Sequence, residues 1–231
     1  MTNLFADNIH ERLVDCARDG NFEEISRLLA IGADPRHNAS RALSLAAEHG
    51  QAQCVKLLIP LSEPQSNNSE ALRKAASNGH AECTLLLAPV SDPKAEDSAA
   101  LRFAAYHGQS EVVRQLIPVS DPKASHSCAI RWAAMNCHVE CVKLLIPVST
   151  LKTSRVVSAV LLLGGNAQIL SLMLASEPLL LDGHDLSRCL ADSISNGHPE
   201  LADLLSSMVE QKAIAEHLPA AMRRNHATAR I

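Results

Sequence analysis

The sequence predicts an all-α solenoid of about seven stacked helix pairs, and three observations support this fold class. A glycine-centred pattern recurs with a period of about 29 residues, a spacing typical of arrays built from one supersecondary unit. Each copy places apolar residues at helical spacing, and a proline closes most copies. The pattern centre falls at these positions: Gly20, Gly50, Gly79, Gly108, Cys137, Gly165 and Gly197.

The first helix of each unit is expected to begin at a serine and to end at the central glycine. In residues 69–89, Ser69 stands where an N-cap hydroxyl would accept a free backbone N–H. Leu72 and the pair Ala75–Ala76 then form one apolar stripe. Gly79 ends the helix, because glycine adopts a positive φ without strain. Equivalent capping serines are expected at Ser40, Ser98, Ser127 and Ser187.

The second helix of this unit begins near His80 and carries Cys83, Leu86 and Leu87 inward. Pro89 stops it, since proline lacks an N–H and clashes with the preceding turn. The same proline closes neighbouring units at Pro60, Pro118 and Pro147. Cysteines recur four residues after the centre, among valines and leucines, so we expect small buried core residues with free thiols. These cysteines are Cys54, Cys83 and Cys141.

These residues resemble the ankyrin repeat. Residues 72–87 (Leu-Arg-Lys-Ala-Ala-x-x-Gly-His-x-Glu-Cys-x-x-Leu-Leu) and 101–113 follow the family's pattern, and residues 28–35 are similar to its Leu-Leu-x-x-Gly-Ala-Asp connection. The resemblance covers roughly residues 8–208 and extends to short-period arrays of bacterial ankyrin proteins. The period is about four residues shorter than the family's usual 33. Because the shortened connection (Pro-Val-Ser-Asp-Pro-Lys-Ala) holds two prolines, we expect β-hairpin fingers to be reduced or absent.

The chain is predicted to form one repeat domain and a short tail. We divide it into an ankyrin-repeat domain over 1–209 and a C-terminal segment over 210–231. The domain comprises an N-terminal capping repeat at 1–34, regular repeats at 35–149 and divergent C-terminal repeats at 150–209. The C-terminal segment comprises a short helix (Glu210–His217) and a basic tail after Pro219. The sixth unit has Leu161–Leu162 in place of the alanine pair, within the apolar run 156–163, and Arg155 in place of the serine. The insertion at 179–183 lengthens the last period. We interpret this region as a change in stacking geometry, with an oligomer or partner contact as the alternative.

In ankyrin proteins the first helices line a concave face, and variable positions there flank the alanine pair. The resemblance therefore implies that the residues five and two positions before each pattern centre meet a partner. Three of the five aromatic residues fall in this class, and aromatics, methionine and arginine are enriched in binding hot spots. The predicted partner-binding residues are Phe103, Tyr106, Trp132, Met135, Lys74, Arg73, Arg102 and Arg131.

Structural alternatives stand beside these assignments. Phe103 and Trp132 would also fill gaps between repeats, although Lys74 at the equivalent position argues against a fully buried site. The arginines would either brace the turns, through loop carbonyls or a carboxylate such as Glu70 or Asp97, or form a cationic rim that selects an acidic partner. The histidines near the pattern centre are interpreted as turn-bracing groups: His49, His80, His107 and His138.

Composition and motifs favour an interaction protein. The formal net charge is −4 although the tail is basic, which disfavours a nucleic-acid role for the repeat body. No apolar run approaches the roughly 18 residues of a membrane span, and no secretory leader pattern follows Met1. Cys137–His138 with Cys141 lacks a second ligand pair, and neither a P-loop nor a nucleophile elbow occurs. We therefore expect no metal, no cofactor and no catalysis.

The function predicted from the sequence is that of a cytoplasmic, monomeric interaction module. Its concave face would bind another protein or an extended peptide, as in a bacterial effector or an immunity protein, with export of an effector left open. The alternative is a structural, self-associating scaffold that uses the apolar C-terminal repeats. Neither nucleic acid nor a membrane is an expected partner.

Overall fold

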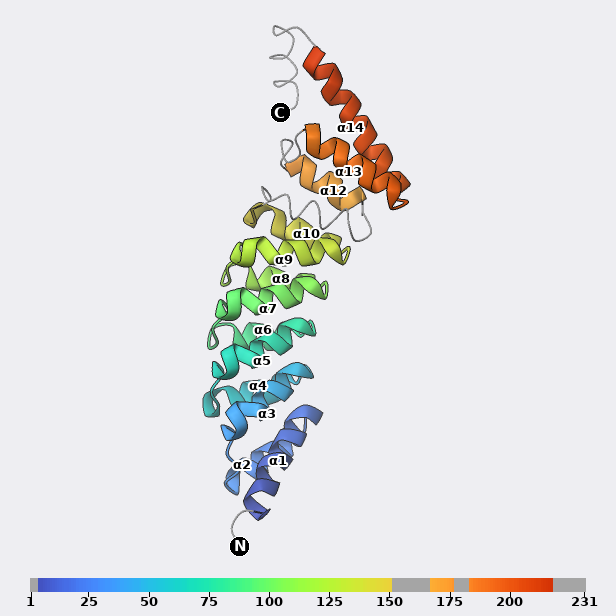
Figure 1. The fold of residues 1–231 in the computed structure, drawn as a ribbon. Helices are drawn as coiled ribbons and strands as arrows, with labels where there is room; N and C mark the ends of the chain where they lie inside the picture. Colours follow the sequence, from blue (N-terminus) through green and yellow to red (C-terminus); the bar gives the residue numbers. More distant parts are fainter. Residues whose placement is uncertain (1–3, 151–166, 177–182, 218–231) are drawn as a thin grey trace. The chain divides into compact units, whose positions relative to one another are not determined.

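The computed structural model describes residues 4–150, 167–176 and 183–217, and within these ranges every regular element is a helix (Figure 1). The predicted all-α repeat solenoid without β-hairpin fingers is confirmed for this part of the chain. It divides into two compact units, Met1–Thr150 and Leu151–Ile231. None of the described helices is both long and apolar enough to cross a membrane.

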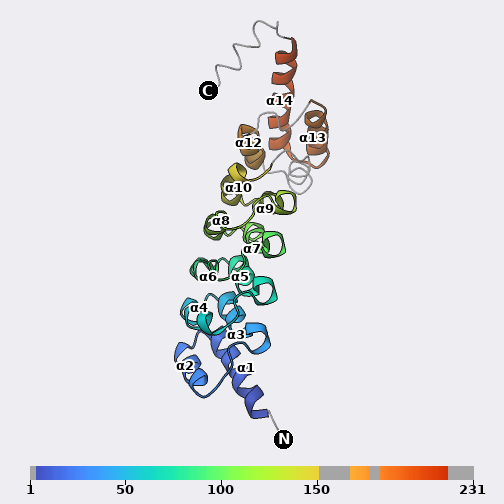
Figure 2. The same ribbon diagram turned by 90° about the vertical axis from the view of Figure 1, so that its left-hand side faces the viewer.

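The first compact unit, Met1–Thr150, stacks its helix pairs in sequence order, with first helices in one layer and second helices in the other (Figure 2). Each helix pair with its loop is one repeat unit of the array. The first helices are α1 (Leu4–Asp19), α3 (His37–Glu48), α5 (Ser66–Ser77), α7 (Ala95–Tyr106) and α9 (Ala124–Met135). The second helices are α2 (Phe22–Ala30), α4 (Ala52–Leu58), α6 (Ala81–Leu87), α8 (Ser110–Leu116) and α10 (Val139–Leu145), with short 3₁₀ turns at Ile59–Leu61 and Ile146–Val148. Each regular second helix ends before its proline, as predicted.

One core runs through this stack and repeats with the sequence. A leucine from each helix of a pair is fully buried, as with Leu72 of α5 and Leu87 of α6, and in α9 Ile130 takes this place. The paired alanines of the first helices, such as Ala104 and Ala105, are also fully buried, which lets neighbouring helices approach closely. A larger side chain at these alanines would overpack the contact at a cost of about 1–3 kcal/mol.

Each regular first helix opens with a left-handed turn that the sequence did not predict. Three successive residues have φ between 48° and 62°, at Asn38–Ser40, Asn67–Ser69, Glu96–Ser98 and Ser125–Ser127. Residues other than glycine adopt this conformation at a cost of roughly 1–2 kcal/mol each. The turn must therefore be held by contacts from elsewhere in the array.

The serine at the end of this turn supplies one such contact, so the predicted capping role is wrong. Ser69 Oγ accepts the backbone N–H of Asp92 in the next unit at 2.8 Å, and Ser98 Oγ accepts that of Asp121 at the same distance. In return, Ser91 Oγ donates to the carbonyl of Pro64 at 3.4 Å. The left-handed turn aims the hydroxyl at the following loop instead of its own helix. Ser187, the remaining predicted cap, lies inside α13 (Gly183–Ser195).

A second contact between units forms at the central glycine. The described central glycines have φ between 71° and 78°, as predicted. In each regular unit, the residue after the central position reaches back to the central glycine of the preceding unit. Thus a Cβ on Gly50 would lie 2.6 Å from His80 Nδ1, and a Cβ on Gly108 would lie 2.5 Å from His138 Nδ1. Gln51 and Gln109 cover Gly20 and Gly79 in the same way. The positive φ and this close approach both require glycine.

Two of the four histidines brace neighbouring units. His80 Nε2 donates to the carbonyl of Glu48, and His138 Nε2 donates to that of Tyr106, both at 2.9 Å. His49 instead hydrogen-bonds the carbonyl of Leu45 in its own helix at 3.0 Å. The fourth, His107, packs edge-on against the Tyr106 ring with centroids 4.9 Å apart. The bracing prediction holds between units only for His80 and His138, which follow the central position.

The periodic cysteines are buried with free thiols, as predicted. Burial, with a smaller contribution from a neighbouring glutamate, raises the pKa of Cys83 and of Cys141 to about 11. These thiols therefore stay protonated at neutral pH and act as small core residues. Among the described residues, no three His, Cys, Asp or Glu side chains are grouped so that they could hold a metal ion.

The second unit contains α12 (Ala167–Ser176), α13 and α14 (Pro199–His217). Its core cluster consists of Leu170, Leu174, Leu186, Cys189, Leu201 and Leu205. The predicted helix Glu210–His217 is present as the C-terminal part of α14, which runs unbroken from Pro199 and ends at His217. Arg155, the run 156–163 and the insertion up to 182 lie outside the described residues, so the predictions made for them stay predictions.

Candidate functional site

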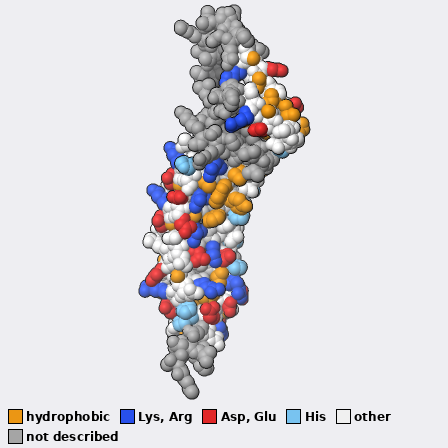
Figure 3. Space-filling model, viewed as in Figure 1, with side chains coloured by type: hydrophobic (Ala, Val, Ile, Leu, Met, Phe, Trp, Pro, Cys, Tyr) orange, Lys and Arg blue, Asp and Glu red, His pale blue; other side chains and the backbone are white. Residues whose placement is uncertain are grey.

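An aromatic patch covers the C-terminal ends of α7 and α9 on the first-helix side of the stack. Its members are the predicted residues Phe103, Tyr106, Trp132 and Met135. The Trp132 ring lies 5.9 Å from the Phe103 ring, tilted by 44°, and 5.5 Å from the Tyr106 ring in an edge-on arrangement. Figure 3, drawn from the same side as Figure 1, shows hydrophobic side chains gathered over these two helices. The structure thus brings residues of two repeats into one contiguous surface.

The aromatic patch is partly exposed. Tyr106 keeps 43% of its surface accessible, while Phe103, Trp132 and Met135 are half-buried. Rings in this state fill the space between α7 and α9 and still present an edge to solvent. Ring pairs in such edge-on and tilted geometries contribute about 0.5–1.5 kcal/mol beyond the area they bury. The two roles considered from the sequence are therefore compatible in one set of side chains.

The predicted arginines Arg73, Arg102 and Arg131 lie at the same position of α5, α7 and α9, and the left-handed turns hold the first two. Arg73 Nη2 donates to the carbonyl of Asn67 at 3.1 Å, and its Nη1 pairs with Glu96 at 2.8 Å. Arg102 Nη2 donates to the carbonyl of Glu96 at 2.7 Å. Both arginines thus brace the turns through carbonyls. This is the bracing role that the sequence analysis gave as one of two alternatives. The carboxylate is Glu96, however, and not Glu70 or Asp97.

Arg102 also reaches the aromatic patch. Its Cζ atom lies 5.4 Å from the centre of the Trp132 ring, within the range of a cation–π interaction. The Nε atoms of Arg102 and Arg131 are buried without a hydrogen-bond acceptor in the described part of the chain. The same is true of Arg73 Nε, although the charge of Arg73 is already paired with Glu96.

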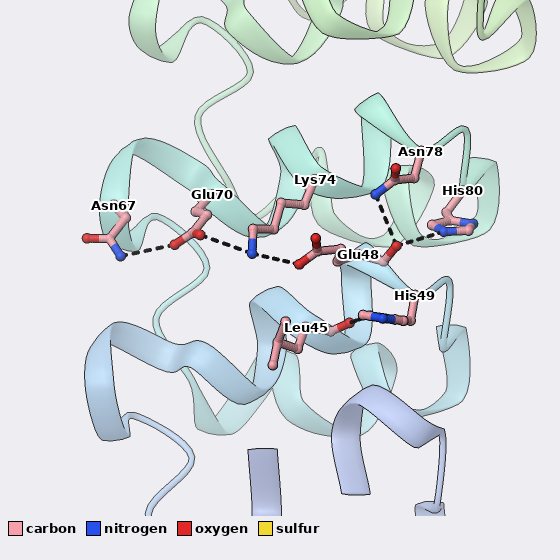
Figure 4. Close-up of polar contacts among 8 residues, drawn as sticks. All are labelled: Leu45, Glu48, His49, Asn67, Glu70, Lys74, Asn78 and His80. Carbon is pink, nitrogen blue, oxygen red and sulfur yellow. Dashed lines mark hydrogen bonds and ion pairs between the residues drawn. The ribbon is translucent and has the colours of Figure 1, made fainter. Parts of the chain in front are cut away.

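Lys74 occupies the Phe103 position one repeat earlier and lies in an ion-pair patch. Its Nζ atom is 2.7 Å from Glu48 Oε2 of α3 and 3.3 Å from Glu70 Oε1 of its own helix (Figure 4). Asn67 donates to the other Glu70 oxygen at 3.1 Å. The carbonyl of Glu48 also accepts hydrogen bonds from His80 and from Asn78. The structure thus places Lys74 apart from the aromatic patch, among partners of its own.

The pKa values in the ion-pair patch follow from these contacts. Burial tends to raise the pKa of Glu70, but hydrogen bonds from Asn67 and Lys74 and the nearby positive charges outweigh it, so the pKa is lowered. Burial tends to lower the pKa of Lys74, but Glu48 and Glu70 outweigh it, so that pKa is raised. Both shifts favour the charged forms, and the charges of Lys74, Glu48 and Glu70 are largely satisfied within the chain.

Sequence reasoning missed two of the residues that organise this face. Glu48 and Glu96 each contact a cation of a neighbouring unit, across 26 and 23 positions of sequence. These separations fall close to the repeat period, so a search for opposite charges about one repeat apart would have found both. The glutamines that alternate with histidines after the central glycine carry a similar periodic signal.

The fold and this surface define a helical repeat array with a partly apolar first-helix face. A family model described as ankyrin repeats (3 copies) matches residues 13–97 and 83–154. The chain therefore belongs to the ankyrin-repeat family. It is similar to a crystal structure of an ankyrin repeat domain from the bacterium Acinetobacter baumannii, with 20% identity and a TM-score of 0.48, over 85% of this chain and 96% of that one. A search of curated proteins found no match.

Membership of this family carries a general statement about function. Ankyrin repeats are generally protein–protein interaction modules, and the family and its fold are typically non-enzymatic scaffolds. The particular partner and the surface that meets it depend on this chain's own side chains.

Proposed function

We propose that this chain is a non-enzymatic module that binds a protein or an extended peptide on its first-helix face, with the aromatic patch as the centre of the contact. The observation that carries this proposal is the cluster of Phe103, Tyr106, Trp132 and Met135 across two repeats. Aromatic and methionine side chains are enriched at the centres of interfaces, where a few residues supply most of the binding energy. Tyr106 combines an apolar ring with a polar hydroxyl, a combination suited to a surface that is exposed to water in the free chain and covered in a complex.

The contrast with the neighbouring repeats supports this placement. In the ion-pair patch, Lys74 is engaged by Glu48 and Glu70, so a partner would have to break these contacts before making new ones. The aromatic patch offers apolar surface, and removing such surface from water lowers the free energy. Binding should therefore centre on α7 and α9, with Lys74 and Arg73 at the edge of the contact.

The test is affinity capture with paired variants of the full chain. Wild-type protein should retain a partner from a lysate, and Phe103→Ala with Trp132→Ala should lose it while the far-ultraviolet circular dichroism spectrum stays unchanged. A matched control is Leu85→Ala, which removes another large hydrophobic side chain, 64% exposed, from the second helix α6. Retention of the partner by the aromatic double variant would sink this assignment, as would equal loss with Leu85→Ala.

A further inference from the structure

We infer that the segment held by the aromatic patch is acidic: a stretch of another protein that offers an apolar side chain to Phe103 and Trp132 and a carboxylate to Arg102 and Arg131. This inference rests on the proposed function and adds the chemistry of the partner to it. It draws on the charges around the patch, which differ from those in the rest of the first-helix face.

The Arg102 guanidinium is held in place before any partner arrives. One nitrogen donates to the carbonyl of Glu96 at 2.7 Å, and the carbon at the centre of the group lies 5.4 Å from the middle of the Trp132 ring. A planar guanidinium fixed at two points loses little further freedom when it binds a carboxylate, because its donors already point in set directions. Arg102 is thus prepared to accept a carboxylate beside an apolar surface.

Charge compensation separates Arg102 and Arg131 from Arg73 and Lys74, the cations of the preceding first helix α5. Arg73 is paired with Glu96 at 2.8 Å and Lys74 with Glu48 at 2.7 Å. In contrast, neither Arg102 nor Arg131 forms an ion pair with any residue that the structure describes, whereas the buried Nε atom without an acceptor is a feature that both share with Arg73. Arg102 and Arg131 are half-buried, and a half-buried cation without a counter-ion gains from an incoming carboxylate.

A basic partner is disfavoured by the same geometry. Aromatic surfaces attract cations, but Arg102 already lies over Trp132, and a second cation would meet its repulsion. A carboxylate gains from Arg102 and Arg131, while an adjacent apolar side chain gains from the rings. Arginine forks bind carboxylates in two-pronged geometry, and the half-buried surroundings strengthen such a bond.

Single-stranded nucleic acid is the other ligand that aromatic and arginine side chains suit. Four carboxylates lie along the first-helix layer: Glu48 in α3, Glu70 in α5, and Glu96 and Asp97 in α7. An oligonucleotide carries a negative charge at every nucleotide, so its backbone would meet these carboxylates along the face, on a chain with a formal net charge of −4. A peptide can instead place a single carboxylate at Arg102 and Arg131 and keep its other residues uncharged. A phosphate-binding surface is normally strongly basic. The observations therefore favour an acidic protein segment over an oligonucleotide.

The test is a selection of displayed random peptides of about ten residues on the full chain, followed by affinity measurements on the enriched sequences. We expect enriched peptides to combine an aromatic or large aliphatic residue with Asp or Glu. Their affinity should fall about tenfold in Arg102→Gln with Arg131→Gln. The control double variant Arg41→Gln with Arg114→Gln removes the same charge from exposed sites elsewhere and should change affinity by about twofold or less.

Each of the other outcomes contradicts the acidic partner, the binding face or both. Enriched peptides that are basic or uncharged, or that weaken equally in both arginine double variants, contradict the acidic partner. If such peptides still lose binding in Phe103→Ala with Trp132→Ala, the proposed binding face stands and only its charge preference falls. Peptides that bind Phe103→Ala with Trp132→Ala as tightly as they bind the wild-type chain contradict the proposed binding face. Arginine-dependent binding of labelled oligothymidylate, or a selection without any enriched sequence, also contradicts the inference.

Discussion

The ion-pair patch on α3 and α5 and the aromatic patch on α7 and α9 share one backbone design and differ in their side chains. In both, a histidine covers the glycine of the preceding unit and donates to a carbonyl there: His80 over Gly50, and His138 over Gly108. At the variable position, however, Lys74 is neutralised within the chain, whereas Trp132 joins two other rings in a half-exposed cluster. The constant positions thus build the array, and the variable positions decide where it can bind.

The largest effect should come from the shared backbone, and it should be equal in the two regions. Gly50→Ala and Gly108→Ala each force a Cβ into a histidine ring and place alanine at positive φ. In each variant, the clash and the strained φ together should lower the free energy of unfolding by roughly 2–4 kcal/mol, measured by urea denaturation. Gly32→Ala is the control, because Gly32 has φ 97° but nothing within 4 Å of a Cβ. An equal loss in all three variants would contradict the covering role of the histidines.

The next effect should separate the two regions by stability alone. Trp132→Ala removes a half-buried ring with two aromatic neighbours, and we expect a loss of about 1–3 kcal/mol in the free energy of unfolding. Lys74→Ala should cost only about 0.5 kcal/mol, since its ion pairs are about one-third exposed and screened by solvent. Comparable losses in the two variants would show that the ion-pair patch is as much a structural element as the aromatic one.

A smaller and uniform effect is expected from the serines that join successive units. Ser69→Ala and Ser98→Ala each leave a backbone N–H of the next loop without its acceptor. Each should lower the free energy of unfolding by about 1 kcal/mol. Ser110→Ala, at the first residue of α8, serves as the control. A near-zero effect of both joining serines would mean that water replaces the hydroxyl at these sites.

The smallest effect is a pH dependence that distinguishes the ion-pair patch from the aromatic patch. Because the folded pKa of Glu70 is lowered, its contribution to stability is present above the ordinary glutamate value of about 4.3. That contribution is lost as the pH falls through the folded pKa. Glu70→Gln should therefore cost about 0.5 kcal/mol at neutral pH and flatten the acid decline of stability below about pH 5. Glu111→Gln, from an exposed pair at 3.5 Å, should leave that decline unchanged; identical acid limbs in the two variants would refute the assignment.

The fold could be predicted from the sequence because its period reports the stack directly. Glycine, the alanine pair and proline each have one dominant local reason to recur, so the helix ends and the core followed from them. The serine role could not be predicted in the same way. Ser69 has the composition of a cap, but its hydroxyl is directed by a left-handed turn that contacts 23 residues further along the chain stabilise.

The candidate site was only partly visible for a related reason. The positions of Phe103, Tyr106 and Trp132 relative to the alanine pair placed all three rings on one face. The ion pairs of Lys74 and Arg73 depend on side chains from adjacent repeats, and their partners Glu48 and Glu96 occupy different positions in their own repeats. No single repeat contains the information that separates a paired cation from an unpaired one. A comparison of charges about one repeat apart points to these pairs, and the stacked structure shows that they form.

Trp132 is the only tryptophan in the chain, so its fluorescence reports on the aromatic patch alone. The most direct test is to titrate the captured partner into the wild-type chain and to follow tryptophan emission together with the heat of binding, using a tryptophan-free fragment of the partner. We expect an emission change that saturates with the heat, and loss of both signals in Phe103→Ala with Tyr106→Ala, which leaves Trp132 in place. Saturable heat without any change in Trp132 emission would contradict the claim that partners bind at α7 and α9.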